Sequence, residues 1–512
     1  MDMKSNGIYM KPIYHLSLLV FAFLMTNRTT TMVDFQIRTH ALKMDRAELQ
    51  RIQDVAQHSN RPQGAPRYSD VCFSSRWHHP RNEADTLDTF ETGEAFFATR
   101  LDWVYSTDPE WIAECRSRGY HFMAALNTIL PDAPGQQKWA KGRIKDMKGE
   151  SVTAPWMRGW ESRWGCANSP EYRATYLSHA SRCIRGGTDS FQMDDPGINH
   201  AAIAWGGCYC VHCREKASEQ GYDLNDPVQM RAFQKASVIA FYSEMRAKIE
   251  SIAGRHVPFS CNNYKGSWNY FAYEAFDYGT AELPHRTAQP DSIYHLLRET
   301  RQLGKAQIFT YVSENVSDIR RVIAMTYACG SHCIVPWDVY LGSTPNGSIR
   351  YYGRPEDYAD LYGFVRANAA YLDGYEDAAV FGPGLIETRY GSGSPIQVDG
   401  DSVYALVRVR PGDIESPVVI HLVNWARNSD NAVTITLNDE IIFGDQPYSA
   451  HVRFPAEFDK DLHQRVRMTG DFSELVIQRD PDVLPRDGRM LVKIAGLKPW
   501  GILVLSPAGS RR

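Results

Sequence analysis

Short apolar runs alternate with longer amphipathic segments between about residues 66 and 375. The short runs have the length and apolar character of buried strands, and the longer segments carry apolar residues at helical spacing. Helices are predicted for Pro109–Arg118, Pro170–Ile184, Pro227–Ile252, Ser292–Leu303 and Val316–Ala328. Strands are predicted for Tyr68–Ser74, Ala98–Tyr105, His121–Asn127, Ser190–Asp194, Pro258–Asn262, Tyr278–Ala281, Gln307–Val312 and His332–Pro336.

Eight strand–helix units over about 300 residues are typical of a (β/α)8 TIM barrel, an α/β fold. A doubly wound parallel sheet is the alternative. No glycine-rich phosphate-binding turn follows the first predicted strand, which weakens that alternative. We therefore expect a barrel over residues 66–375.

Beyond about residue 376 the helical pattern stops and short alternating runs follow, bounded by Gly, Asp and Pro. This pattern predicts an antiparallel β-sandwich over residues 376–512. Pro383-Gly384 and the stretch from Gly391 to Pro395 are expected to mark the joint. The predicted strands are Val403–Val409, Pro417–Val423, Ala432–Leu437, His451–Phe454, Glu474–Gln478, Met490–Ile494 and Ile502–Leu505.

The amino terminus carries an apolar run, Leu16–Met25, after Lys4 and Lys11. The run is too short to cross a bilayer and has the length of the apolar part of a signal peptide. We therefore interpret residues 1–32 as a signal segment and expect export, to the periplasm or outside the cell. The alternative is that translation begins at Met32. Residues 33–65 are predicted to form a polar, partly helical lead-in.

The charges of the chain nearly balance, because 56 Lys and Arg against 60 Asp and Glu leave a formal net charge of −4. Without a basic excess, nucleic acid is not expected as a partner. No other stretch is apolar and long enough to cross a membrane, so no integral membrane partner is expected. The sequence is compatible with a homo-oligomer as well as with a monomer. The 12 Trp and 27 Tyr suit a cleft that stacks sugar rings, and equally a large core.

Polar and aromatic residues stand where the predicted barrel strands end. The active site of a TIM barrel lies at the carboxyl ends of its strands, so these residues are expected to meet at one rim. In strand order they are Arg76 and Trp77; Asp102 and Trp103; Asn127; Asp194 and Asp195; Asn262, Asn263, Tyr264 and the nearby Trp268; Glu282 and His285; Glu314; and Trp337 and Asp338.

Carboxylates, amides and tryptophans on one rim are typical of glycoside hydrolysis. One carboxyl group donates a proton, another acts as nucleophile or base, and flat rings bind the sugar. An acidic residue after a strand is also often only a helix N-cap, so the alternative for each is structural. We predict catalytic roles for Asp194, Asp195, Glu282 and Glu314, without an organic cofactor. The carbohydrate substrate is predicted to contact Arg76, Trp77, Asp102, Asn127, Asn263, Tyr264, Trp268, His285, Trp337 and Asp338.

A cluster of cysteines follows the fourth predicted strand. Cys208, Cys210 and Cys213 lie within six residues of one another, and Cys166 precedes the helix that leads into that strand. Four thiolates close a tetrahedral zinc shell, which is the arrangement of a structural rather than a catalytic metal. Disulfides are the alternative, which export would favour. We predict structural zinc.

Three segments in this order resemble the barrel of glycoside hydrolase family 42, the β-galactosidases. They are Cys166-Ala-Asn-Ser-Pro-Glu-Tyr-Arg173, Phe191-Gln-Met-Asp-Asp195 and Cys208-Tyr-Cys-Val-His-Cys213. The resemblance spans roughly residues 66–345 and is specific around 164–213. It implies zinc on the four cysteines and retaining hydrolysis of a β-glycoside, with galactose as a candidate sugar. It also implies an acid/base on the fourth strand and a nucleophile at Glu314.

Two features depart from that family. Its fourth strand ends Asp-Asn-Glu, with Glu as acid/base, whereas here the same place reads Asp194-Asp195-Pro196. Proline cannot transfer a proton, and Asp195 is the nearest substitute. The family also carries a trimerisation domain between barrel and sandwich, for which the stretch 376–395 leaves no room. The chain is therefore expected to be a divergent relative.

Three functions follow. The first is a retaining β-glycosidase acting on an oligo- or polysaccharide, with Asp195 as acid/base and Glu314 as nucleophile. The second resembles α-galactosidase-like barrels, with Asp194 or Asp195 as nucleophile and Glu282 or Asp338 as acid. The third is a carbohydrate-binding protein without catalysis, in which Pro196 marks the lost acid.

Overall fold

The structure is a computed structural model that describes residues 51–74, 89–337, 339–340, 350–388, 394–426, 431–444, 446–486 and 489–508. All of these belong to one compact unit, Leu49–Arg512. The predicted signal segment and the first part of the lead-in lie outside the described residues, as do Arg76, Trp77 and Asp338. Their roles stay predictions.

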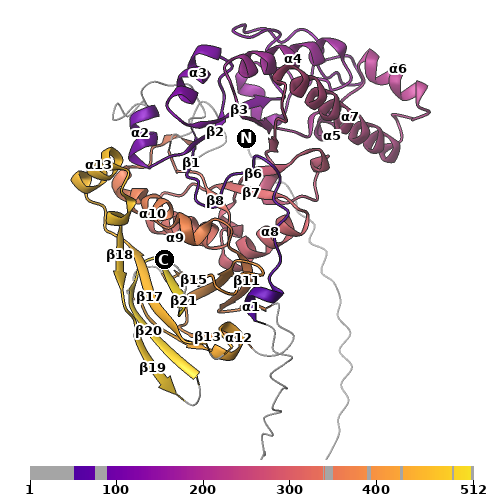
Figure 1. Cartoon of the computed structure of the whole chain (residues 1–512). Helices are drawn as coiled ribbons and strands as arrows, with labels where there is room; N and C mark the ends of the chain where they lie inside the picture. Colours follow the sequence, from indigo (N-terminus) through magenta and orange to yellow (C-terminus); the bar gives the residue numbers. More distant parts are fainter. Residues whose placement is uncertain are drawn as a thin grey trace, which may run out of the picture. The chain divides into compact units, whose positions relative to one another are not determined.

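Eight parallel strands follow one another in sequence order around a barrel (Figure 1). Its first and last strands meet where the Val335 amide donates to the Cys72 carbonyl at 2.8 Å. The predicted TIM barrel is therefore confirmed, with every predicted strand in place. The strands are β1 (Cys72–Phe73), β2 (Arg100–Val104), β3 (His121–Asn127), β4 (Ser190–Asp194), β5 (Phe259–Cys261), β6 (Tyr278–Glu282), β7 (Ala306–Thr310) and β8 (His332–Cys333).

The barrel helices begin where the sequence supplies capping residues. Ser169 accepts a hydrogen bond from the Tyr172 amide, and Asp226 accepts one from the Val228 amide. A proline in the first turn of each helix needs no such partner. The helices between and after the strands are α2 (Thr89–Ala95), α3 (Pro109–Ser117), α4 (Pro170–Arg185), α5 (Ile198–Ala202), α6 (Val211–Glu219), α7 (Pro227–Ala253), α8 (Pro290–Gln302), α9 (Val316–Ala328), α10 (Pro355–Ala367) and α11 (Ala369–Leu372).

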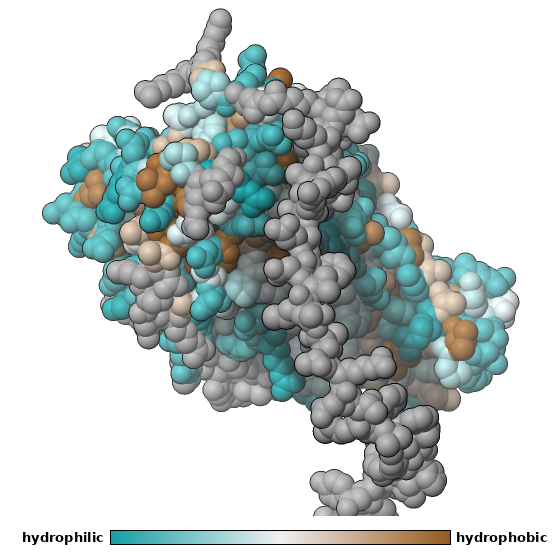
Figure 2. Space-filling view, turned by 90° about the horizontal axis from the view of Figure 1, so that it is seen from below, coloured by the Kyte–Doolittle hydropathy of each residue, from teal (hydrophilic) through white to brown (hydrophobic). Residues whose placement is uncertain are grey.

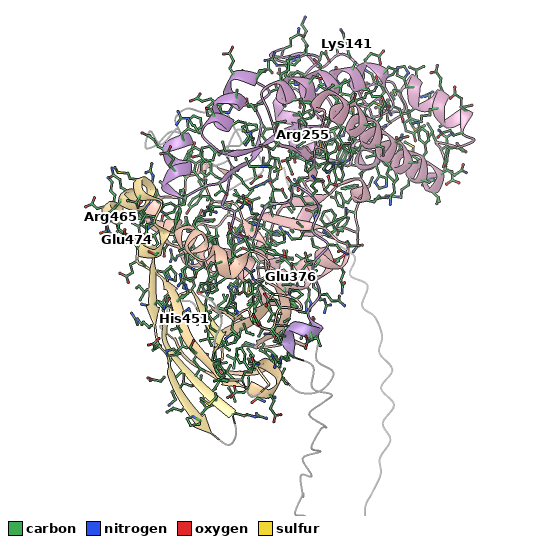
Figure 3. All side chains as sticks on the ribbon, in the orientation of Figure 1. Lys141, Arg255, Glu376, His451, Arg465 and Glu474 are labelled. Carbon is green, nitrogen blue, oxygen red and sulfur yellow. The ribbon has the colours of Figure 1, made fainter. Side chains whose placement is uncertain are left out.

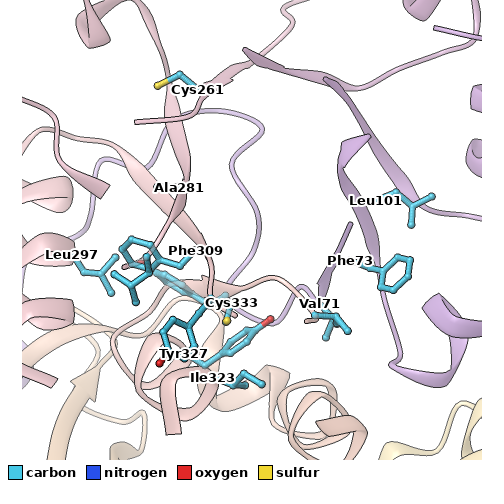
Figure 4. Close-up of a cluster of buried hydrophobic side chains, with 14 of the residues drawn as sticks. Val71, Phe73, Leu101, Cys261, Ala281, Leu297, Phe309, Ile323, Tyr327 and Cys333 are labelled. Carbon is cyan, nitrogen blue, oxygen red and sulfur yellow. The ribbon is translucent and has the colours of Figure 1, made fainter. Parts of the chain in front are cut away.

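Apolar side chains fill the layer between strands and helices. Figure 4 shows Phe309 of β7 near Leu297 of α8, and Cys333 of β8 near Tyr327 of α9. All four are buried. Full burial of one such side chain stabilises the fold by roughly 1.5–3 kcal/mol, so this layer holds the strand ends in place.

A two-layer antiparallel β-sandwich follows the barrel, as predicted. One sheet has the order β12-β11-β14-β15-β21-β17-β18 and the other the order β13-β16-β20-β19. Buried side chains such as Val407, Ile420 and Ile435 fill the space between them. The strands are β11 (Glu376–Gly382), β12 (Leu385–Thr388), β13 (Ile396–Asp399), β14 (Val403–Val409), β15 (Val418–Asn424), β16 (Asn431–Leu437), β17 (Tyr448–Pro455), β18 (Val476–Arg479), β19 (Asp482–Arg486), β20 (Arg489–Leu497) and β21 (Trp500–Pro507). Outside these sheets lie the helix α1 (Ile52–Val55) and the hairpin of β9 (Val339–Tyr340) and β10 (Arg350–Tyr351).

The expectation that helices stop at residue 376 was wrong. The sandwich carries α12 (Asp439–Ile442) and α13 (Lys460–Thr469). The Asp459 side chain caps α13. The exposed ion pair Arg465–Glu474, at 2.7 Å, links α13 to the short 3-10 helix Phe472–Leu475 that follows it (Figure 3). Pro383-Gly384 also differs from expectation, because it forms the turn between the paired strands β11 and β12 rather than a linker.

The sandwich packs on α9 and α10 of the barrel. The Trp500 ring of β21 lies 5.1 Å from Phe364 and 6.2 Å from Tyr327, centroid to centroid. Glu376, at the start of β11, accepts a hydrogen bond of 3.0 Å from the Tyr68 hydroxyl (Figure 3). These contacts make one continuous core across the two parts.

No helix among the described residues is long and apolar enough to cross a membrane. On the face shown in Figure 2, the coloured residues are mostly hydrophilic, and the hydrophobic ones lie in small groups. Such scattered apolar residues are ordinary for a protein surface.

Candidate functional site

Asp194, the last residue of β4, is a carboxylate at the carboxyl end of the barrel that accepts hydrogen bonds from three side chains. The Asn127 amide donates to its Oδ2 at 3.1 Å, and the Asn262 amide donates to its Oδ1 at 3.1 Å. The Tyr105 hydroxyl also donates to Oδ2. Donors from three neighbouring strand ends favour the charged form of a carboxylate and fix its orientation. This fits a nucleophile or base.

An irregularity in β2 aims Tyr105 at Asp194. The pairing of β2 with β3 shifts register between Leu101 and Val104, and Trp103 has a φ of 59°. The indole N–H of Trp103 donates to the Tyr105 hydroxyl at 3.1 Å. A left-handed residue that is not glycine costs free energy and recurs at functional sites. Trp103 therefore acts as a support for Tyr105, and through it for Asp194.

Asp195 follows in a left-handed conformation, with a φ of 50°. The Thr128 hydroxyl donates to its carbonyl oxygen at 2.7 Å. Its carboxyl atom Oδ2 is buried and has no hydrogen-bond partner among the described residues. Burial raises the pKa of Asp195 well above the usual value, and the charges of Asp194 and Glu282 raise it further. The surroundings of Asp195 therefore favour its protonated form.

We expect Asp195→Asn to raise the free energy of unfolding at pH 7. The pKa of Asp195 is raised in the folded state. Between pH 4 and that raised pKa, the native state therefore keeps a proton that the unfolded state has lost. Stability then falls as pH rises, and asparagine removes this cost. Urea denaturation at pH 4 and pH 7 measures the gain, which should vanish at pH 4.

Asp480→Asn, at an exposed position in the sandwich, is the control variant measured beside Asp195→Asn. An Asp195→Asn protein that is less stable than the parent at pH 7 would contradict the raised pKa.

The other two predicted catalytic residues differ in their surroundings. Glu282 ends β6, its side chain is exposed, and its charge acts on Asp195. Glu314 lies four residues beyond β7, in the turn before α9. Its exposed side chain makes no hydrogen bond within the described part of the chain. The structure thus brings Glu282, and not Glu314, into the electrostatic group of Asp194 and Asp195.

Several predicted substrate contacts lie inside the protein. Asp102 is fully buried and forms an ion pair with Arg100 at 2.9 Å. Asn263 is also fully buried and exchanges two hydrogen bonds with the Gln307 amide, at 2.8 and 3.0 Å. Both side chains are engaged within the barrel, whereas Asn127 is joined to Asp194.

The predicted aromatic contacts divide into buried and exposed residues. Trp268 donates to the Thr300 hydroxyl at 2.9 Å, and Trp337 packs 5.1 Å from the Phe73 ring. Both tryptophans are buried. Tyr264 is exposed, and so is His285, whose Nδ1 lies 3.1 Å from the Tyr311 hydroxyl. Open aromatic surface is therefore found on the loops after β5 and β6.

The four predicted metal-binding cysteines come together. The sulfur of Cys166 lies 3.6 Å from each of the sulfurs of Cys208, Cys210 and Cys213. All four are free of disulfides. A tetrahedron with zinc–sulfur bonds of about 2.3 Å has edges of about 3.8 Å, so the cluster fits a four-coordinate metal. His212 instead contacts Glu171 at 3.3 Å.

Side-chain amides surround this cysteine cluster. Asn199 donates to the sulfurs of Cys166 and Cys213, each at 3.4 Å, and Asn168 donates to Cys213 at 3.3 Å. Amide donors to sulfur stabilise thiolates and orient metal ligands. Asn199 lies on α5, four residues after Asp195, so the cluster also anchors the segment that follows β4.

Comparisons with known proteins give distant likenesses only. No family model matches the chain, and no curated protein matches it. Among solved structures, α-L-fucosidase isoenzyme 2 from Paenibacillus thiaminolyticus is 10% identical over 86% of this chain and 100% of that one, with a TM-score of 0.42. A Paenibacillus sp. cycloisomaltooligosaccharide glucanotransferase is 10% identical over 85% of both chains, with a TM-score of 0.48.

The native debranching enzyme of Nostoc punctiforme is also similar, at 10% identity over 88% of this chain and 100% of that one, with a TM-score of 0.46. At such identities and TM-scores, these likenesses carry no argument about activity. The resemblance to glycoside hydrolase family 42 has no matching family model and stays a prediction.

Proposed function

We propose that this chain is a retaining glycoside hydrolase in which Asp194 is the nucleophile and Glu282 the acid/base. The observation that carries the proposal is the Asp194 carboxylate, held by donors from Tyr105, Asn127 and Asn262. Glu282 offers a second carboxyl group on the same rim, exposed to solvent. Two carboxyl groups at a barrel mouth are what glycoside hydrolysis requires.

In the first step, Asp194 attacks the anomeric carbon while Glu282 protonates the departing glycosidic oxygen. The glycosidic C–O bond breaks, and a glycosyl ester forms on Asp194. In the second step, Glu282 takes a proton from water, which displaces the sugar from Asp194. Asn127 and Asn262 keep Asp194 oriented throughout. This assignment replaces the roles of Asp195 and Glu314 that the family resemblance implies.

A second assignment of the acid rests on one observation. The raised pKa of Asp195 favours the protonated form of that carboxyl group, which is the form a general acid needs. Its Oδ2 is buried, however, whereas the Glu282 side chain is exposed. Access to a leaving group therefore favours Glu282.

For the substrate we propose an oligo- or polysaccharide that contains galactose. A β-linkage follows from the family resemblance, whereas an aspartate nucleophile on the fourth strand is the arrangement of α-galactosidase-like barrels. A panel of α- and β-linked aryl glycosides tests both, and NMR of the first product anomer tests retention. A 2-fluoro glycoside of the best sugar should label the peptide that contains Asp194.

Two results of this experiment would contradict the proposal. A label on Glu314 would restore the assignment implied by the resemblance. Binding of glycans without hydrolysis of any glycoside would favour a carbohydrate-binding barrel that has lost its acid at Pro196.

We further propose that Cys166, Cys208, Cys210 and Cys213 hold one structural zinc ion. The ion would tie the segments after β3 and β4 together and take no part in the reaction. We expect about one zinc per chain by elemental analysis. Cys210→Ser should lower that content and reduce Tm by roughly 5–10 °C, because a metal that binds only the folded state stabilises it.

Cys115 is buried on α3, outside the cluster, and serves as the control. Cys115→Ser should leave the zinc content unchanged. A purified protein with far less than one equivalent of zinc, and with these cysteines in disulfides by mass spectrometry, would refute the metal site.

A further inference from the structure

A cleft of about 430 Å³ lies beside the barrel mouth, at the junction with the sandwich. Its walls come from the loops after β6 and β7, from α9, and from the end of β15. The side chains that matter here are His285, Gln289, Tyr311, Asp318, Arg321 and Trp425. Ligand sites occur preferentially at domain interfaces, and a cleft of this volume has the size of a small-ligand site.

The contact between α9 and the sandwich fixes Trp425 in this wall. The Arg321 guanidinium donates to the Trp425 carbonyl at 2.8 Å and lies 5.3 Å from its ring centroid. Asp318 forms an ion pair with Arg321 one helical turn away. The aromatic wall is thus held by two parts of the chain, as a preorganised binding surface requires.

The cleft is close to the proposed acid/base. Glu282 and His285 are three residues apart, so their backbones are separated by at most about 11 Å. The Leu283 amide donates to the Thr310 carbonyl at 2.9 Å, which joins the loops after β6 and β7 at their roots. The cleft and Glu282 therefore lie on the same loop region after β6.

We propose that this cleft is a distal subsite that binds an uncharged sugar unit of the substrate chain; the proposal rests on the proposed function. The half-buried Trp425 ring offers apolar surface, and Gln289 and His285 offer hydrogen bonds to hydroxyl groups. Asp318 and Arg321 balance each other's charge. An uncharged sugar matches this lining better than a uronic acid or a sulfated sugar does.

The subsite predicts a dependence on chain length. The probes are the aryl monoglycoside that the chain hydrolyses fastest and oligosaccharides of two to six units of the same sugar. Trp425→Ala and Gln289→Ala should each lower kcat/KM for the longest oligosaccharide, by roughly 10- to 100-fold for Trp425→Ala. Hydrolysis of the aryl monoglycoside should stay within about twofold. Gln289 is exposed, so its truncation leaves the fold intact.

Gln446, exposed on the sandwich, gives a matched control, and Gln446→Ala should change neither rate. Equal losses on short and long substrates, or no loss on long ones, would overturn the subsite and leave the proposed function standing. If the parent protein hydrolyses nothing, the proposed function fails, and an array of immobilised neutral oligosaccharides becomes the probe. Binding that Trp425→Ala abolishes would then support the subsite, whereas binding that persists, or no binding, would overturn it.

Discussion

Asp194→Asn is expected to lower kcat by about four orders of magnitude while the fold and its Tm stay close to those of the parent. The amide has the shape of the carboxylate, and its oxygen can still accept from Asn127 and Tyr105. Its NH2 group then faces Asn262, whose side-chain amide must turn over so that its Oδ1 accepts. The new asparagine cannot form a glycosyl ester. Initial rates on an aryl glycoside, beside circular dichroism and thermal unfolding, measure both quantities.

Two further variants sharpen the test. Asp194→Gly with added azide should regain activity and give a glycosyl azide, because a small anion can occupy the vacated position. Glu314→Gln is the matched control and should keep activity within about tenfold. Loss of activity in Glu314→Gln together with full activity in Asp194→Asn would exchange the two roles.

The barrel could be predicted because its strands and helices are separated by strong local signals. The helices α3, α4 and α7 begin at a proline that follows Asp108, Ser169 and Asp226 respectively, and each of these residues caps its helix. Strands between such helices end at defined residues, so the sequence places Asp194, Asn127 and Glu282 at one rim. The candidate catalytic residues could be limited to these strand ends, because the position of each strand end follows from local sequence pattern alone.

Tyr105 could not be predicted as a partner of Asp194. In a regular strand, successive side chains point to opposite faces. Residue 104 would then share a face with Asp102, and Tyr105 would point to the opposite face. The register shift after Leu101 and the left-handed Trp103 change that alternation. A bulge leaves little trace in a single sequence, although the aromatic pair around Val104 is consistent with one.

The helix α13 was not predicted from the sequence, for a different reason. Only His463 and Val466 of its residues are buried, so its apolar pattern is weak. Its signals are the Asp459 cap at one end and Gly470, with a φ of 73°, at the other. The four-cysteine cluster could be predicted because Cys208, Cys210 and Cys213 lie within six residues of one another, a spacing that is typical of metal ligands.

Glu282→Gln is expected to separate substrates by their leaving groups. With poor leaving groups, such as a second sugar, kcat/KM should fall by about 10²- to 10⁴-fold, because departure needs a proton from the acid. With activated nitrophenyl glycosides the fall should stay below about tenfold. The ratio kcat/KM is the right measure, since it reports the step that forms the glycosyl ester.

Asp195→Asn is the paired variant that decides which carboxyl group supplies this proton. Burial favours the protonated form of Asp195, but its buried Oδ2 faces no described hydrogen-bond partner, so we expect a small loss that is equal for both leaving-group classes. Glu282 sits at the end of β6 with its side chain in solvent, where a glycosidic oxygen can approach it. A leaving-group dependence that appears in Asp195→Asn and not in Glu282→Gln would move the acid to Asp195 and leave Asp194 as the nucleophile.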